Sequence, residues 1–212
     1  MVIYTVGHSN HAIGHFIGLL LRHEVKVVAD VRSTPFSRFN PQFNRERLQG
    51  ALEAAGIRYV FLGEELGARA QDPALYEDGR VSYAKLAATP AFGTGLDRLE
   101  AEMQTARVSL MCAERDPLQC HRTILVSREL TRQRGIAVTH ILQDGSLETG
   151  REASQRLVET LKLPRDDLFY DEAALFEAAF DKQGQRVAYS VRPVAGEAPP
   201  AKGRKAPGPK PL

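Results

Sequence analysis

Short apolar runs alternate along this chain with longer segments in which apolar residues recur every three or four positions. The runs are rich in β-branched residues and predict five strands, at residues 2–6, 25–31, 57–62, 108–112 and 136–142. Strands that are apolar on both faces are typical of a parallel sheet with helices on each side. The pattern therefore predicts an α/β protein with a mostly parallel five-stranded sheet.

The segments between the runs predict helices, and several carry capping signals. Ile13, Phe16 and Leu20 are spaced to share one face of a first helix. Asn44 is a candidate N-cap for a second helix, and Thr89, directly before a proline, begins another. The remaining predicted elements are a helix over 120–134 that ends before a glycine, helices over 150–161 and 172–183, and an extended piece over 186–191.

Three parts of the chain differ in character. Residues 1–142 form the predicted α/β core, residues 143–192 a helical C-terminal extension packed on the core, and residues 193–212 a disordered tail rich in proline and glycine. Within the core, residues 63–83 are polar and irregular, which is typical of a functional or loosely ordered connection. A chain of 212 residues is long enough for one domain with a substantial core.

Charge and hydropathy limit where the protein is expected to act. The net charge is +2, and the last twenty residues carry four cations against Glu197 alone, a balance of +3. This basic tail either attracts nucleic acid weakly and in a salt-sensitive way, or only keeps the protein soluble. No apolar stretch reaches the roughly 18 residues of a membrane span, and the N-terminus does not resemble a secretory leader. We therefore expect a cytoplasmic protein, with no membrane partner and with reduced cysteines.

The two cysteines, Cys112 and Cys120, lie in one short stretch together with Glu114 and His121. Cys112 ends the fourth predicted strand, and Cys120 begins the helix that follows. A thiolate at either position can act as a nucleophile, although a cysteine at a strand end is also a common buried apolar residue. The thiols could instead form a redox pair, or bind a metal with His121, although the spacing is not a standard zinc pattern.

Reactive residues also follow the other predicted strands. His8, Ser9 and Asn10 come directly after the first strand, and Asp30 and Arg32 lie at the end of the second. Ligands of parallel α/β sheets bind outside the carboxyl ends of the strands. We therefore expect these residues to share one cleft with the cysteine stretch.

Each ionisable side chain in this set has a structural alternative. His8 suits general acid–base work near neutral pH, or it is a hydrogen-bonded loop histidine. Asp30 and Glu114 could move protons, or each carboxylate could simply pair with a cation such as Arg32 or Arg122.

The loop after the second predicted strand combines arginines with phenylalanines. A guanidinium group binds phosphate in a bidentate manner, and an aromatic ring can stack on a base. We predict that Arg32, Arg38 and Arg122 bind an anion, with Ser9 and Asn10 as further contacts. The alternative is a loop whose rings pack inward and whose arginines face water. The rings concerned are those of Phe36, Phe39 and Phe43.

These motifs together resemble one prokaryotic family. They are, in order, Tyr-Thr-Val-Gly-His-Ser-Asn at 4–10, Asp-Val-Arg at 30–32, Asn-Pro-Gln-Phe-Asn at 40–44, Met-Cys-Ala-Glu at 111–114 and Cys-His-Arg at 120–122. The pattern is similar to that of the family catalogued as domain of unknown function 488, over about residues 2–142. The resemblance implies a single Rossmann-like α/β domain with an active site and no established reaction. Residues 66–69 resemble the family's Leu-Gly-Gly-Arg element, with Ala68 in place of the second glycine.

The sequence favours an enzyme that acts on a phosphate-bearing substrate, either a nucleotide or a nucleic acid. In this hypothesis a thiolate comes from Cys112 or Cys120, and protons move through His8, Asp30 or Glu114. The rival hypotheses are a non-catalytic nucleic-acid-binding module and a thiol redox sensor. No dinucleotide fingerprint, Walker loop or serine-hydrolase elbow occurs, and no cofactor is predicted beyond the metal alternative.

Overall fold

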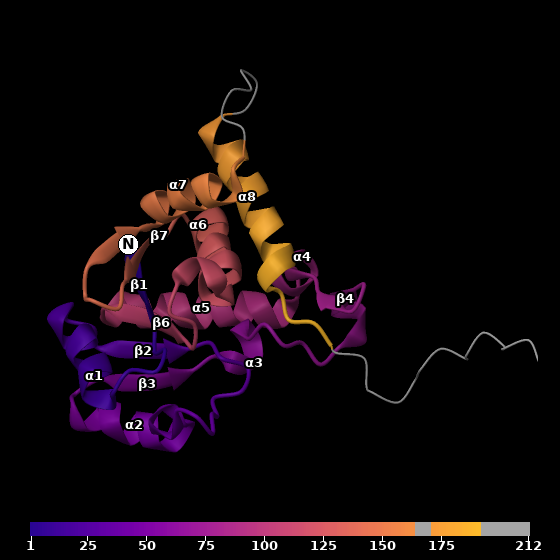
Figure 1. The fold of residues 1–212 in the computed structure, drawn as a ribbon. Helices are drawn as coiled ribbons and strands as arrows, with labels where there is room; N and C mark the ends of the chain where they lie inside the picture. The colour runs from indigo at the N-terminus through magenta and orange to yellow at the C-terminus, as the bar shows by residue number, and fades with distance from the viewer. Residues whose placement is uncertain (164–170, 192–212) are drawn as a thin grey trace, which may run out of the picture.

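A six-stranded sheet forms the centre of the fold in the computed structural model, which describes residues 1–163 and 171–191 (Figure 1). The strands are β1 (Val2–Gly7), β2 (Val27–Asp30), β3 (Arg58–Phe61), β6 (Val108–Cys112), β7 (Ala137–Ile141) and β8 (Leu147–Thr149). Their order across the sheet is β3-β2-β6-β1-β7-β8, and every neighbouring pair is parallel except β7 with β8. The predicted α/β fold with a mostly parallel sheet is confirmed, with one strand more than the five expected.

The additional strand, β8, has no apolar run to mark it, because its sequence is Leu-Glu-Thr. It returns from β7 through a turn in which Gly145 has φ 82°, a conformation that glycine adopts without strain. The ring of His23, just after the first helix, contacts this turn, with Nε2 at 2.9 Å from the Gly145 carbonyl oxygen. A short polar edge strand of this kind is therefore held by local turn geometry and by contacts from a distant part of the chain.

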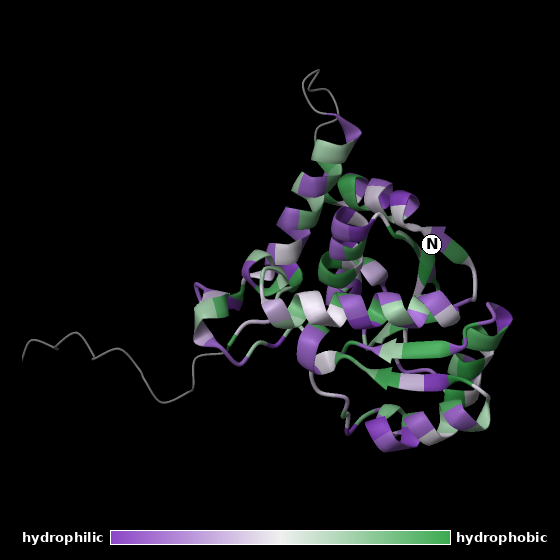
Figure 2. Ribbon diagram, turned by 180° about the vertical axis from the view of Figure 1, so that it is seen from behind, coloured by the Kyte–Doolittle hydropathy of each residue, from purple (hydrophilic) through white to green (hydrophobic). Residues whose placement is uncertain are grey.

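Helices cover both faces of the sheet, since successive residues of a strand point to opposite sides. They are α1 (Ile13–Arg22) and α2 (Arg45–Ala54) on one face, and α5 (Pro90–Thr105) and α6 (Arg128–Arg134) on the other. Val28 and Met111 pack under α1 and α2, whereas Val27 and Leu110 pack against α5. Figure 2 shows the hydrophobic residues gathered along the central strands. The result is a three-layer arrangement with two apolar cores.

Two of the three capping predictions are confirmed. Thr89 caps α5, and its hydroxyl oxygen accepts a hydrogen bond from the backbone N–H of Phe92. Gly135 ends α6 with φ 64°. Asn44 occupies the N-cap position of α2, but its side chain accepts a hydrogen bond from the N–H of Ser37, at 2.7 Å, rather than from the helix. The prediction that Asn44 caps α2 through its side chain is therefore wrong.

The predicted helix over 120–134 consists of two parts. Its first part, Arg122–Ser127, is a π-helix in which every residue is buried, and α6 continues from it. The Ser127 hydroxyl donates a hydrogen bond to the Arg122 carbonyl oxygen, at 2.7 Å. A π-turn is wider than an α-turn and is often found at functional sites. Here it begins directly after the Cys-His pair at 120–121.

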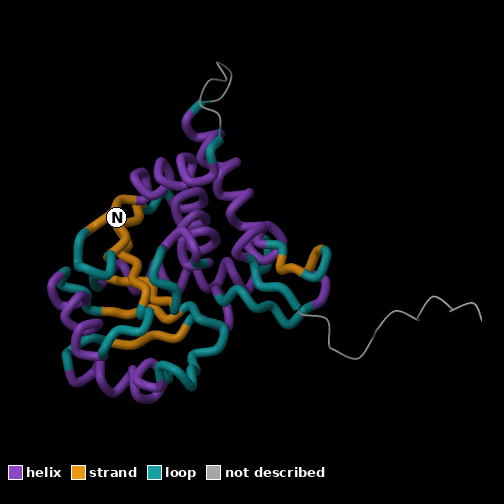
Figure 3. Tube along the Cα trace, in the orientation of Figure 1, coloured by secondary structure: helices purple, strands orange, loops and turns teal. Residues whose placement is uncertain are grey.

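Residues 63–83 contain short elements that the irregular composition hid. They are α3 (Gly63–Leu66), a 3₁₀ turn (Pro73–Leu75), β4 (Tyr76–Glu77) and β5 (Arg80–Val81), and α4 (Tyr83–Ala87) follows. Figure 3 shows the β4–β5 hairpin standing apart from the main sheet. This connection is therefore ordered.

The C-terminal helices form a third apolar core over the loop that follows β6. They are α7 (Gly150–Leu161) and α8 (Glu172–Val187). Because α8 continues to Val187, the prediction of an extended piece over 186–191 is wrong for its first two residues. After α8 the chain pairs with the hairpin, where the N–H of Val81 donates to the Tyr189 carbonyl oxygen at 2.9 Å.

The predicted tail, residues 193–212, lies outside the described residues. Within the described ranges, no helix is long and apolar enough to cross a membrane.

Candidate active site

A cavity of about 530 Å³ lies at the carboxyl ends of β1, β2 and β6. β1 and β6 are neighbours in the sheet, and the chain leaves them toward opposite faces, to α1 after β1 and to α6 after β6. Ligands of open α/β sheets bind at such a point, because the two diverging loops leave a crevice between them. The cavity is lined by His8 just after β1, Arg32 just after β2, Cys112 at the end of β6 and Glu114 in the loop that follows. The structure thus brings together the strand-end residues that were expected to share a cleft, with the exception of Asp30, which does not line the cavity.

Backbone contacts align the loops on the floor of this cavity. Gly7 pairs with Cys112 in the sheet, and the N–H groups of His8 and Ser9 donate to the carbonyl oxygens of Cys112 and Ala113, both at 2.9 Å. A β-carbon at position 7 would lie 2.0 Å from the carbonyl oxygen of Glu114, so only glycine fits there. Gly7 therefore allows the loop after β6 to lie directly against β1.

The two thiols share one carboxylate oxygen. Cys112 Sγ lies 3.2 Å from Glu114 Oε2, and Cys120 Sγ lies 2.9 Å from the same atom. Both cysteines are free and buried, but only Cys112 lines the cavity, and Glu114 reaches solvent there. One oxygen between two sulfur atoms gives a path by which a proton can pass from one thiol to the other.

His121 completes the cluster from the start of the π-helix. Its Nε2 lies 2.9 Å from the carbonyl oxygen of Val31, and its Nδ1 lies 3.6 Å from Cys112 Sγ. A carbonyl oxygen only accepts hydrogen bonds, so Nε2 carries a proton and Nδ1 is directed at the sulfur. A nucleophile, a base and a group that orients the base form the arrangement typical of an activated cysteine.

The charges in this cluster favour an ion pair between a thiolate and an imidazolium. Although burial opposes ionisation, the contact with Cys112 and the positive charges of Arg122 and His121 lower the pKa of Cys120. Burial and the charge on Cys120 then raise the pKa of Cys112, so the pair loses one proton readily and holds the second. The neighbouring thiolate raises the pKa of His121, in spite of burial. When the proton of Cys112 passes through Glu114 to Cys120, the negative charge lies on Cys112, at the wall of the cavity.

The surroundings of Glu114 favour the protonated form of its carboxyl group. Burial and the negative charge on Cys120 raise the pKa of its carboxyl group. A carboxyl group with a raised pKa beside a nucleophile is suited to protonating a leaving group. The acid–base role proposed for Glu114 from the sequence is compatible with this geometry.

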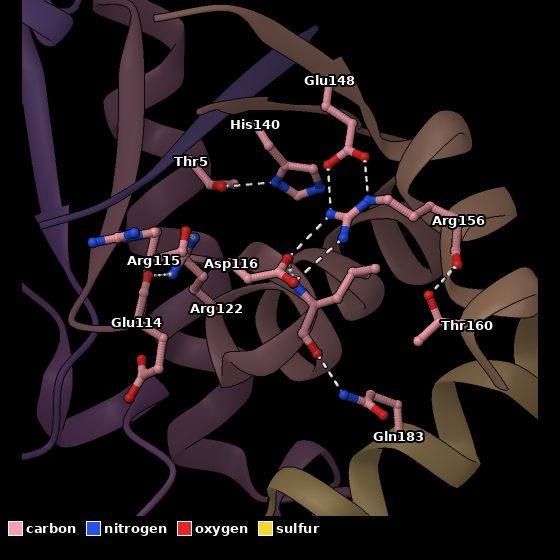
Figure 4. A network of polar contacts seen from close by, with 11 residues as sticks. Thr5, Glu114, Arg115, Asp116, Arg122, His140, Glu148, Arg156, Thr160 and Gln183 are labelled. Carbon is pink, nitrogen blue, oxygen red and sulfur yellow. Dashed lines mark hydrogen bonds and ion pairs between the residues drawn. The ribbon is translucent and has the colours of Figure 1, made fainter. Parts of the chain in front are cut away.

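Arg122, which was predicted to bind an anion, does not line the cavity. Its side chain is 1% exposed, and its Nη1 and Nη2 donate to the carbonyl oxygens of Glu114 and Arg115, at 2.7 and 3.3 Å. Figure 4 shows Arg122 lying against the backbone of this loop. Its role is to hold the loop after β6 and to place a buried positive charge near the thiols.

The C-terminal extension holds the other end of the same loop. Arg156 of α7 pairs with both Asp116 and Glu148, and Gln183 of α8 donates to the Leu118 carbonyl oxygen at 2.8 Å (Figure 4). The loop that carries Glu114 is therefore fixed at both of its ends.

Asp30, Arg32 and His8 form a buried chain of hydrogen bonds. Asp30 is fully buried, and it accepts from Arg32 at two positions (2.9 and 2.6 Å) and from the Tyr59 hydroxyl at 2.8 Å. Arg32 Nη1 donates to His8 Nε2 at 3.1 Å, and Nη2 also donates to the Phe43 carbonyl oxygen. Asp30 therefore orients Arg32, and it does not line the cavity.

His8 does not suit acid–base work near neutral pH, as the sequence had suggested. Burial and the charge of Arg32 lower the pKa of His8 to about 4. Its Nδ1 lies 2.8 Å from the Ser9 carbonyl oxygen, so Nδ1 carries the proton and Nε2 accepts from Arg32. His8 is thus a neutral ring that positions Arg32.

Arg32 keeps one N–H for a ligand. A guanidinium group has five N–H groups, and four are used by Asp30, His8 and Phe43. The remaining N–H on Nη1 belongs to a side chain that lines the cavity. Ser9 and Asn10 also line the cavity, where side chains that contact a bound anion would have to lie.

Arg38 is exposed and lies outside the cavity lining, so the prediction that it binds the anion there is not supported.

Several cavity residues were missed by the analysis of the sequence. Tyr83, Arg69, Val187 and Tyr189 line the cavity, and they come from the irregular connection and from the end of α8. The Leu-Gly-Ala-Arg segment was the only signal for this wall, and nothing in the sequence marked Tyr189.

Comparison with known proteins identifies one family and no characterised relative. Residues 12–128 match the model of the family described as domain of unknown function DUF488. No curated protein and no solved structure matches the chain. The matched segment includes Arg32 and the whole Cys112–His121 cluster, and it ends before α7 and α8.

Proposed function

This chain belongs to the DUF488 family, whose description assigns no reaction, and we propose from the site itself that it is an enzyme with a cysteine nucleophile. The proposed substrate carries phosphate and is a nucleotide or a nucleic acid. The observation that carries the proposal is the contact between Cys112 Sγ and His121 Nδ1, at 3.6 Å, on the wall of the cavity.

The proposed reaction proceeds in two steps. The Cys112 thiolate forms a bond to the electrophilic atom of the substrate, and the electrons of the broken bond leave with the departing group. Glu114 gives that group a proton. Water then attacks the covalent intermediate, Glu114 takes back a proton, and the thiolate is restored.

Polar groups around the nucleophile support a phosphate-bearing substrate. Arg32 offers one N–H, Ser9 and Asn10 offer further donors, and Arg69 adds a positive charge at the cavity wall. Arginine and short polar side chains are the common protein contacts of phosphate.

A metal centre is the second candidate, and one observation favours it. The possible ligand atoms of Cys112, Cys120 and His121 all lie within 4.8 Å of one another. Ligand atoms around tetrahedral zinc are roughly 3.5 Å apart, so a small contraction would be needed. The hydrogen bond from His121 Nε2 to a backbone carbonyl is also typical of a metal-bound histidine. Glu114 would then serve a metal-bound water as acid and base.

Two measurements on one sample of purified protein, never treated with a chelator, separate the two candidates. They are elemental analysis for bound metal and titration of the free thiols. The nucleophile predicts substoichiometric metal, with one thiol, Cys112, reacting quickly in the native protein and Cys120 only after denaturation. Near-stoichiometric zinc with both thiols protected until denaturation would contradict the nucleophile and favour the metal centre.

A further inference from the structure

Three large side chains line the cavity without any part in the thiol chemistry. They are Phe36, Arg69 and Tyr189. Phe36 is 64% exposed and Tyr189 is 38% exposed, so each ring leaves apolar surface open to water. Exposed aromatic rings on a cavity wall mark a place where a ligand can cover them.

Arg69 and Tyr189 are already stacked on each other. The guanidinium carbon of Arg69 lies 4.9 Å from the centre of the Tyr189 ring. Their backbones are anchored separately, since the N–H of Arg69 donates to Ser33 Oγ at 3.0 Å and the Tyr189 carbonyl oxygen accepts from Val81. Within residues 1–163 and 171–191, no carboxylate pairs with Arg69. The pair is thus a fixed flat surface with a free positive charge.

The loop that carries Phe36 adds hydrogen-bonding groups around its ring. Thr34, Ser37 and Asn40 line the cavity beside Phe36. A ligand that suits both the rings and the polar groups is a nucleobase, which is flat and has hydrogen-bonding groups along its edge. Proteins bind nucleobases by aromatic stacking and by contacts to the base edge.

We propose that Phe36 and the Arg69–Tyr189 pair form a subsite for the base of a nucleotide whose phosphate lies near Arg32. This inference rests on the proposed phosphate-bearing substrate and defines its class further. Tyr189 lies beyond residue 128, so the wall that selects the base comes partly from outside the matched family segment.

Binding is measured by calorimetry on the full chain carrying Cys112→Ser, which prevents turnover. The probes are the four ribonucleoside 5′-monophosphates, ribose 5-phosphate and inorganic phosphate. We expect at least one nucleoside monophosphate to bind roughly 5- to 150-fold more tightly than ribose 5-phosphate, the range for one stacked base.

Added substitutions locate the ring contact. Tyr189→Leu and Phe36→Leu are each expected to remove most of that preference while leaving the Kd of ribose 5-phosphate unchanged, and Tyr189→Phe is expected to keep it. Phe39→Leu is the matched control, because Phe39 lies on the same loop, is 93% exposed and does not line the cavity. It should not alter binding of any monophosphate.

The same assay with a short single-stranded oligonucleotide identifies the source of the base. A Phe39→Leu effect confined to the oligonucleotide indicates a nucleotide within a strand, and an oligonucleotide that binds no more tightly than the monophosphates indicates a free nucleotide. Both results keep the subsite. Equal affinity for ribose 5-phosphate and all four monophosphates, no binding of any monophosphate, or a loss in Tyr189→Leu that includes ribose 5-phosphate, would overturn it. Because Cys112 is absent from every arm, failure of the cysteine mechanism leaves these results unchanged.

Discussion

Replacing Cys112 with serine is expected to lower turnover of a phosphorylated nucleoside by about 10³-fold or more, the loss typical of removing a nucleophile. A hydroxyl group at this position can keep the contacts to Glu114 and His121, but it ionises far less readily than a thiol. Turnover is measured with substrates found by screening phosphorylated nucleosides and short single strands.

Cys120→Ser is the matched control for this experiment. Its side chain does not line the cavity, and a serine hydroxyl can still donate to Glu114. We expect a loss of about tenfold or less, the effect of one altered hydrogen bond. If Cys120→Ser were inactive and Cys112→Ser active, the nucleophile would be assigned to the wrong thiol. Full activity in a variant lacking both thiols would exclude a thiolate mechanism.

Acid is expected to destabilise the fold strongly because two histidines are buried in neutral form. Burial, with the charges of Arg122 and Arg156, lowers the pKa of His140 to about 3, and the pKa of His8 is about 4. In the unfolded chain both rings take up a proton near pH 6.5. As the pH falls below 6.5, the unfolded state therefore binds protons that the folded state does not, and stability decreases.

The expected loss is about 1.4 kcal/mol per pH unit for each ring, or on the order of 5 kcal/mol between pH 6.5 and 4.5. The raised pKa of His121 affects stability mainly above pH 6.5, because both the folded and the unfolded state hold that proton at lower pH, so it offsets little of this loss. Urea unfolding across this pH range measures it. His140→Asn should remove about half of the slope, whereas the exposed His15→Asn should leave it unchanged. A free energy of unfolding that stays constant from pH 6.5 to 4.5 would contradict the account of these two rings.

The site could be located from the sequence because it follows from the sheet. Apolar runs that are buried on both faces require parallel strands, and parallel strands place their carboxyl ends at one edge. Cys112, His8 and Arg32 each come directly at or after such an end, so their proximity in the cavity follows from the order of the runs.

The roles of individual side chains could not be predicted in the same way. Arg122 looks like an anion-binding residue in the sequence, but the π-helix turns it inward to bind backbone carbonyl groups. Nothing in a local sequence shows the direction of one side chain at a helix start. His8 is similar, because its low pKa depends on Arg32, which lies 24 positions away in the chain.

The wall formed by the C-terminal part was beyond prediction for another reason. Tyr189 reaches the cavity only because α8 packs on the loop after β6 and the chain then pairs with a two-residue strand, β5. Contacts between such short and distant segments leave no periodic pattern in the sequence.

The measurement that tests the central claim most directly is the pH dependence of iodoacetamide alkylation at Cys112, followed by peptide mass analysis. Because the coupled Cys112–Cys120 pair loses its first proton readily and the charge can reach Cys112 through Glu114, the account predicts a first midpoint of alkylation below the value of about 8.5 for an ordinary thiol. It also predicts that His121→Asn moves the midpoint upward, while the exposed His15→Asn leaves it in place. A midpoint at or above the ordinary value that does not respond to His121→Asn would contradict an activated Cys112.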